Sequence, residues 1–195
     1  AETLVITLKD KVTELYVELI YGVFNKKDII TRCARILYKG EGSITLEKAA
    51  SMSMDITYGK WDLINLHGKH CLERQVDRRP LYHATETVGS TRGTSSHQQN
   101  PFIIISDRDT TENNGACFGF MLVYSGGFKA EVELDQFDSV RVVMGIQDDR
   151  FTWKLNGGEC FDTPEVILSY TSEGLTKLSQ NYHYVIRTNI CRGEY

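Results

Sequence analysis

Short stretches of alternating apolar and polar residues, separated by turn-forming residues, most restrict the fold of this 195-residue chain. The first begins almost at once, with Leu4, Ile6 and Leu8 on one side of a predicted strand. About a dozen short strands with frequent turns are typical of an antiparallel β-sandwich, so we predict a mainly β, supersandwich-like fold. The further predicted strands lie at residues 15–21, 29–38, 44–47, 52–57, 61–67, 102–106, 117–124, 128–134, 140–146, 151–155 and 165–170.

Two segments depart from this alternation. Residues 75–100 hold few aliphatic side chains and predict a long loop with one or two short strands, of the kind that often carries function. From Ser172 onward, apolar residues three and four apart predict a C-terminal amphipathic helix that runs to the end of the chain. Its N-cap would be Ser172, and Arg192 with Gly193 would form its last turn. The predicted division is a sandwich over residues 1–171 and a linking helix over residues 172–193. The apolar stripe comprises Leu175, Leu178, Tyr182, Val185, Ile186 and Ile190.

Charge and composition limit the partners. The chain has 22 Lys and Arg against 26 Asp and Glu, a net charge of -4, which gives no basic surface of the kind that nucleic acid requires. The sequence has no apolar run long enough to cross a membrane, and residues 1–9 do not form a secretion signal. Five scattered cysteines without a C-x-x-C pair indicate reduced thiols used mainly in packing. We therefore predict a cytoplasmic protein with neither a nucleic acid nor a membrane as partner.

Catalytic and metal-binding patterns are weak. Retaining or inverting glycoside hydrolysis needs two facing carboxylates, but the candidate aspartates sit at turns, where Asp commonly bonds to nearby backbone amides. His67, His70 and Cys71 would face different sides of a strand, which disfavours a metal site. Ser95 or Ser96 beside His97 lacks the strained elbow of a serine nucleophile. We predict no catalytic residue, no metal and no cofactor in this chain. The candidate aspartates are Asp107, Asp109, Asp135, Asp138, Asp148 and Asp149.

Two further features keep alternatives open. Arg78 and Arg79, in the charged segment before Pro80, either lie on a solvated strand face or form bidentate carboxylate contacts with another domain. Trp61 and Trp153 lie in alternating strands and are predicted in the core, although both are suited to stacking on sugar rings.

Several segments, taken together and in order, resemble the N-terminal domain of the family 36 glycoside hydrolases, the bacterial-type α-galactosidases. The resemblance covers nearly the whole chain. It is carried by LERQVDRRPL (72–81), GSTRGTSSHQQNPF (89–102), GFMLVYSG (119–126), EVELDQF (131–137), FDTPEVILSY (161–170), SQNYH (179–183) and RGEY (192–195).

The resemblance implies an N-terminal β-sandwich followed by a catalytic (β/α)₈ barrel that removes terminal α-galactose from sugars such as melibiose and raffinose with retention. Both catalytic aspartates of the family lie on the barrel. Neither the family's Lys-Trp-Asp nucleophile segment nor its Gly-rich acid/base segment has a counterpart here. Lys60-Trp61-Asp62 does not count as one, because it precedes the shared segments. We therefore expect a fragment that starts partway through the domain, with an unpaired edge strand that invites self-association. Its partners would be its own barrel and, in the parent, further copies in a homo-oligomer.

Polar residues of the long loop are the candidates for the boundary between sandwich and barrel, and no residue can be assigned to sugar contact. The rival hypothesis is an independent carbohydrate-binding, lectin-like sandwich that would stack sugars on its aromatic side chains. The candidate interface residues are Arg78, Arg79, Arg92, His97, Gln98 and Asn100.

Overall fold

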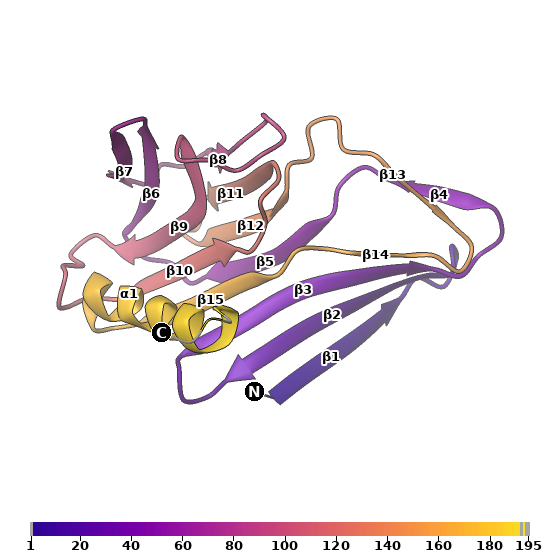
Figure 1. The fold of residues 1–195 in the computed structure, drawn as a ribbon, viewed down its shortest axis with the longest axis horizontal. Coiled ribbons are helices and arrows are strands. Elements are labelled where there is room, and N and C mark those ends of the chain that lie inside the picture. Colours follow the sequence, from indigo (N-terminus) through magenta and orange to yellow (C-terminus); the bar gives the residue numbers. More distant parts are fainter. Residues whose placement is uncertain (1, 192, 194–195) are drawn as a thin grey trace.

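The computed structural model describes residues 2–191 and 193 of the chain. Two antiparallel sheets of very different size face each other (Figure 1). The larger sheet has nine strands, and β14 (Cys160–Asp162) joins it by pairing with β3. Its other strands follow the order β1 (Glu2–Lys9), β2 (Leu15–Phe24), β3 (Ile29–Tyr38), β15 (Val166–Thr171), β10 (Cys117–Leu122), β9 (Gln99–Asp107), β6 (Trp61–Lys69) and β7 (Leu72–Pro80).

The smaller sheet has four strands, in the order β5 (Ala50–Ile56), β12 (Val140–Ile146), β11 (Phe128–Leu134) and β8 (Thr85–Gly89). A separate ribbon pairs β13 (Trp153–Asn156) with β4 (Ser43–Leu46). The predicted mainly β, antiparallel sandwich with a C-terminal helix is therefore confirmed.

The main hydrophobic core fills the space between the smaller sheet and part of the larger one. Phe120 and Leu122 of β10 point into it, opposite Val132 of β11 and Val142 of β12. Their alternation with differently facing neighbours is the period of two that the sequence shows.

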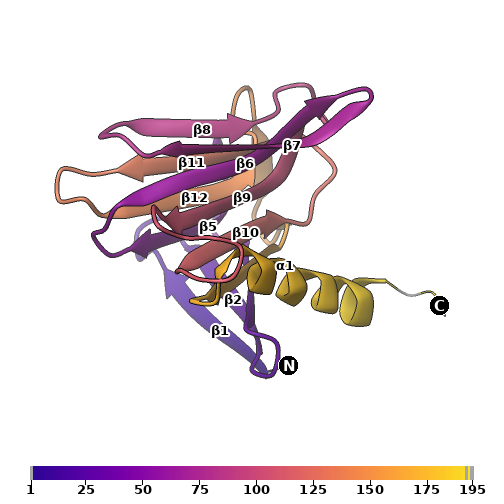
Figure 2. The same cartoon turned by 90° about the vertical axis from the view of Figure 1, so that its left-hand side faces the viewer.

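A second core lies on the opposite face of the larger sheet, beneath helix α1 (Gly174–Val185) (Figure 2). Cys117 of β10 and Ile167 of β15 contact this core, together with Leu178 and Tyr182 of the helix. The ring of Tyr182 meets Phe102 edge-on at a centroid distance of 5.3 Å. Strand β10 thus supplies alternate side chains to both cores.

The helix differs from the sequence prediction at both ends. It begins at Gly174 with Glu173 at the N-cap position, so the prediction of Ser172 as N-cap is wrong. A π-helical turn, Ile186–Ile190, follows α1, and Cys191 is extended, with φ −70° and ψ 128°. The helical segment therefore ends before Gly193, and Arg192 lies outside the described residues.

Residues 75–100, predicted as a long loop with one or two short strands, hold most of β7 and all of β8. Strand β7 runs through Pro80 as the outer partner of β6, and β8 follows before the loop proper at residues 90–98. The residues of β7 are polar because most of this edge strand is exposed, so its alternation carries no apolar signal.

Candidate functional site at the two ends of strand β9

Arg78 and Arg79, adjacent in β7, project to opposite faces of the larger sheet because side chains alternate along a strand. Arg79 lies on the side of the smaller sheet, where its Nε donates to Glu86 Oε2 of β8 at 2.7 Å. Its Nη1 donates to Asn65 Oδ1 at 2.6 Å and to Asp77 Oδ2 at 3.0 Å. The guanidinium thus joins the edges of the two sheets.

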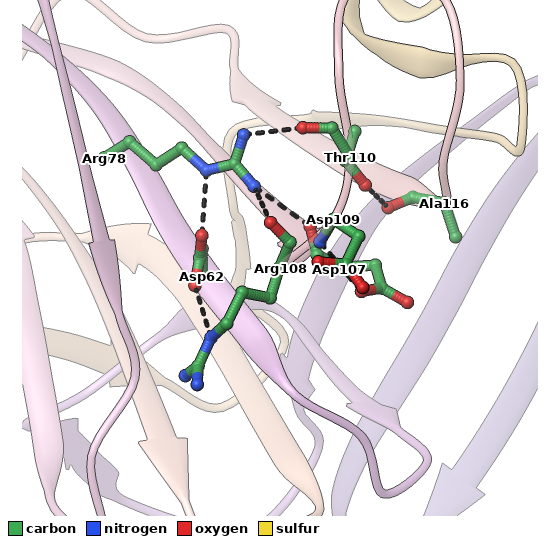
Figure 3. A network of polar contacts seen from close by, with 7 residues as sticks. All are labelled: Asp62, Arg78, Asp107, Arg108, Asp109, Thr110 and Ala116. Atoms are coloured by element: carbon green, nitrogen blue, oxygen red, sulfur yellow. Dashed lines mark hydrogen bonds and ion pairs between the residues drawn. The ribbon is translucent and has the colours of Figure 1, made fainter.

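Arg78 lies on the helix side and binds the carboxylate of Asp62, a residue that is only 5% exposed (Figure 3). Its Nε donates to Asp62 Oδ2 at 2.8 Å. Its Nη groups donate to three backbone carbonyls, those of Asp107, Arg108 and Thr110, at 3.1, 2.7 and 2.7 Å. One side chain therefore compensates a buried charge and holds the loop that connects β9 with β10.

Sequence reasoning missed Asp62 and its second partner Arg108, whose Nε lies 3.5 Å from Asp62 Oδ1. The one available signal was an aspartate within the mainly apolar stretch WDLINL, because a buried carboxylate requires a charged or hydrogen-bonding partner. Sequence could not tell which arginine fills this role.

The same loop, residues 107–116, holds the start of helix α1. The amide of Leu175 donates to the Thr111 carbonyl at 3.1 Å, and that of Thr176 donates to the Glu112 carbonyl at 2.9 Å. These contacts satisfy helix N–H groups that have no partner within the helix and replace a side-chain cap. Gly174, with φ +85°, lies so close to this loop that a β-carbon would stand 2.5 Å from the Asn114 nitrogen.

The other candidate interface residues lie near the opposite end of β9. Arg92, His97 and Gln98 belong to loop 90–98, and their side chains are exposed and make no hydrogen bond or ion pair within the described residues. Asn100, at the start of β9, donates from Nδ2 to the Leu66 carbonyl at 3.2 Å. A polar hollow of about 280 Å³ opens beside this loop, lined by Gly89, Ser90, Thr91, Arg92, Ser96, Gln98 and Gln99.

The structure therefore separates the six predicted residues into two groups. Strand β9 contains nine residues, which at about 3.3 Å per residue places its ends some 26 Å apart. Helix α1 starts at the Asp107 end, and its Tyr182 contacts Phe102, so the helix runs back toward loop 90–98. Figure 2 shows the end of the helix and this loop on the same side of the molecule.

The carboxylates of Glu131 and Asp148 lie close together beside the smaller sheet, but both belong to an ion-pair cluster with Lys48 and Lys129. Lys129 Nζ lies 2.8 Å from Glu131 and 2.9 Å from Asp148, and Lys48 Nζ lies 2.7 and 3.3 Å from the same two groups. Burial pushes the pKa of Asp148 upward, but hydrogen bonds from the two lysines outweigh it and leave that pKa lowered. The same lysines lower the pKa of Glu131.

A glycosidase general acid needs a raised pKa, and a sugar needs room between the carboxyl groups. The cavity at this cluster measures about 10 Å³. The cluster therefore stabilises the sheet and is not arranged as a catalytic pair. Asp107 and Asp135 accept hydrogen bonds from nearby backbone amides, as expected of aspartates at turns.

The aromatic and thiol predictions are partly wrong. Trp61 packs against the main core, whereas Trp153 is 48% exposed and contacts Phe161 at a ring distance of 5.2 Å. Cys117 is buried, and burial raises the pKa of its thiol to about 11. Three other cysteines, Cys71, Cys160 and Cys191, are exposed instead of packed. Over the part of the chain that the structure describes, no helix has the length and apolar character needed to cross a membrane.

These features define a class of protein: a β-sandwich domain whose larger sheet carries a core on each face and a C-terminal helix anchored at one end. The family model "Glycosyl hydrolase family 36 N-terminal domain" matches residues 1–156. The chain belongs to glycosyl hydrolase family 36, as part of its N-terminal domain.

Among the relatives, the bifunctional α-galactosidase/sucrose kinase AgaSK of Mediterraneibacter gnavus is 48% identical over all 195 residues, which are 21% of its length. The crystal structure of α-galactosidase AgaA of Geobacillus stearothermophilus in complex with raffinose has a TM-score of 0.96 and 45% identity. That match covers 98% of this chain and 27% of AgaA. This chain thus spans about a quarter of the relatives it matches.

A putative aldose 1-epimerase of Escherichia coli K12 has a TM-score of 0.54 at 12% identity, over 87% of this chain and 65% of that protein. This likeness concerns the fold alone.

Proposed function

We propose that this chain is the non-catalytic N-terminal sandwich of an α-galactosidase that removes terminal α-galactose from sugars of the melibiose and raffinose type with retention of configuration. The observation that carries the proposal is the match of the entire chain to α-galactosidases such as AgaSK and AgaA, at 48% and 45% identity. The catalytic aspartates would belong to a (β/α)₈ barrel elsewhere in the parent.

Within the parent, residues 1–171 would form a supporting domain, and residues 172–193 would link it to the barrel. The observation that favours this proposal concerns the end of the molecule at which the helix finishes. Loop 90–98, which contains Arg92, His97 and Gln98, lies on that side of the molecule (Figure 2), and the side chains of these three residues have no hydrogen-bond or ion-pair partner within the described residues, so they would be able to bind a neighbouring domain. Most hydrogen-bond donors of the Arg78 and Arg79 side chains are already bonded within the sandwich, so these two residues would contribute few contacts to the interface. A homo-oligomer of the parent is part of the same proposal.

Three exposed free thiols favour a reducing compartment, and we place the parent in the cytoplasm on that ground. The chain itself would need no cofactor or metal.

The test compares the 195-residue chain with the complete polypeptide of its reading frame on a chromogenic α-galactoside and on raffinose. The complete polypeptide should cleave both, and the chain alone should cleave neither. In the complete polypeptide, Arg92→Ala combined with His97→Ala should weaken domain docking, whereas Arg141→Ala on a remote exposed strand position is the control. Turnover by the purified chain alone would refute the non-catalytic role.

A sugar-binding module is the second candidate, and the exposure of Trp153 beside Phe161 is the observation that favours it. Calorimetric titration of the chain with galactose, melibiose and raffinose separates the two functions. A supporting domain gives no binding heat. A sugar-binding module gives heat that Trp153→Ala abolishes and that Trp61→Phe leaves in place.

A further inference from the structure

The helical segment at the C-terminal end of the chain changes its hydrogen-bond pattern after Val185. Residues Ile186–Ile190 form a π-helical turn, in which the amide of Cys191 donates to the Ile186 carbonyl, five residues back, at 2.8 Å. Because π-helical turns are rare, an α-helical continuation is the default, and the wider turn needs interactions that favour it. Burial does not favour it, since none of residues 186–190 is buried.

Lys27, on the hairpin between β2 and β3, contacts this turn from elsewhere in the chain. Its Nζ donates to Thr188 Oγ1 at 2.7 Å and to Asn189 Oδ1. The same ammonium group lies over the ring of Tyr184, 4.7 Å from the ring centroid. The cation therefore meets an aromatic face and two oxygen atoms, at the end of a helix, where the dipole favours positive charge.

The spacing of these three contacts fits the π-turn better than an α-helix. Each residue of an α-helix turns by about 100°, so Asn189 would lie about 140° around the axis from Tyr184. A π-turn bonds residues that are five apart, which brings these two positions nearer to one side. Thr188 supports the distortion, because its Oγ1 accepts from Lys27 and donates to the Tyr184 carbonyl at 2.7 Å. A side-chain bond to the carbonyl four residues back is a known cause of helix bending.

The hairpin that carries Lys27 is itself held by buried hydrogen bonds. Ser169 Oγ of β15 donates to the Asp28 carbonyl at 2.8 Å and accepts from Asn181 Nδ2 of helix α1 at 3.2 Å. Ser169 and Asn181 are only 5% and 6% exposed. The amide of Lys27 also donates to the Phe24 carbonyl at 2.9 Å, within the hairpin turn. Lys27 therefore reaches the π-turn from a base that is fixed both to the larger sheet and to the body of the helix.

We infer that Lys27 selects the register of residues 186–191, which form a π-turn while its ammonium group is in place and continue as an α-helix without it. The change transfers the Ile186 carbonyl from the Cys191 amide to the Ile190 amide, one residue earlier in the chain. It also turns the residues that follow by about 100° around the helix axis, the rotation of one residue. One positive charge thus sets the direction in which the chain leaves the helix.

The test compares Lys27→Met with Lys26→Met. Lys26 is the exposed neighbour, and its side chain has no hydrogen bond or ion pair within the described residues. Crystal structures of both variants, in the complete polypeptide of the reading frame, show which amide the Ile186 carbonyl accepts from. In solution, scalar couplings across hydrogen bonds identify the same pair in the 195-residue chain. No activity is measured, so the result is independent of the proposed galactosidase function.

Lys27→Met should move the partner of the Ile186 carbonyl by one residue, to the Ile190 amide, and Lys26→Met should leave it at Cys191. Thr188→Val removes the hydroxyl between the ammonium group and the Tyr184 carbonyl and should cause the same shift, whereas Thr188→Ser should not. A π-turn that persists in Lys27→Met would overturn the inference. So would a segment that unwinds and leaves the Ile186 carbonyl without a partner, because Lys27 would then hold the turn in place without choosing its register.

Discussion

At the scale of single residues, Arg78 has a large predicted effect on stability. Arg78→Met would remove the close donor of Asp62 Oδ2 and the guanidinium donors of three loop carbonyls, and would leave Asp62 with Arg108 Nε at 3.5 Å as its remaining charged partner. Since removing one partner of a buried ion pair costs about 3 kcal/mol, we expect a loss of that order in the free energy of unfolding, measured by urea denaturation. Arg141→Met breaks an exposed pair with Asp55 and should change little. Equal effects of the two substitutions would contradict this account.

The lysine–carboxylate cluster predicts a pH dependence. The pKa of Asp148 is lowered in the folded protein, so its contribution to stability is complete above the ordinary value of 3.8 and is lost as the pH falls through the folded value. Asp148→Asn should therefore reduce the free energy of unfolding at about pH 7, and by progressively less as the pH falls below 3.8. Urea denaturation across this range checks the sign. A difference that does not change with pH would contradict it.

Sequence identified Arg78 and Arg79 as notable but could not distinguish them. Neighbours in a strand face opposite sides, and their partners lie far away in sequence: Asp62 and Thr110 for Arg78, and Asn65 and Glu86 for Arg79. Only the register of β6 against β7 and β9 brings these groups together. The polar loop 90–98, by contrast, could be predicted from composition, because the prediction of a loop does not depend on the register of paired strands.

At the scale of elements, the anchoring of α1 predicts an unusual sensitivity of Gly174. An Ala there would combine the strain of φ +85° with contacts of 2.5–2.7 Å to the backbone of Thr111, Glu112 and Asn114. An Ala at Gly158, with φ +90°, would have the same backbone strain but no close contact, because its β-carbon would meet no atom within 4 Å. We expect Gly174→Ala to cost about 3 kcal/mol and Gly158→Ala about 1 kcal/mol in unfolding free energy. Similar losses would show that the loop yields to the methyl group.

The period of the apolar residues predicted most strands and the helix, because burial on one face imposes a period of two or of about 3.6. The start of α1 was misplaced because its cap is supplied by the backbone of loop 107–116, which leaves no Ser or Asp signature. The bounds of strand β7 could not be predicted for a related reason. Its pairing with β6 is made by backbone groups, and its polar, mostly exposed side chains give no apolar period.

At the scale of the whole molecule, the pairing of the strands could not be predicted from the sequence. Alternation in residues 4–8 and 15–21 indicates an apolar face but not what covers it. The inequality of nine strands against four appears only when the sheets are assembled. Strands β1, β2 and β3 of the larger sheet therefore extend beyond the smaller one (Figure 1).

Strand β10 couples the two hydrophobic cores. Because Phe120 serves one core and Cys117 the other, neither core can open while the other keeps all its contacts. Heating should therefore produce one two-state transition, with equal calorimetric and van't Hoff enthalpies. Fluorescence of Trp61 and thiol labelling of Cys117 should report the same midpoint. Two separated midpoints would mean that the helix side melts as an independent unit.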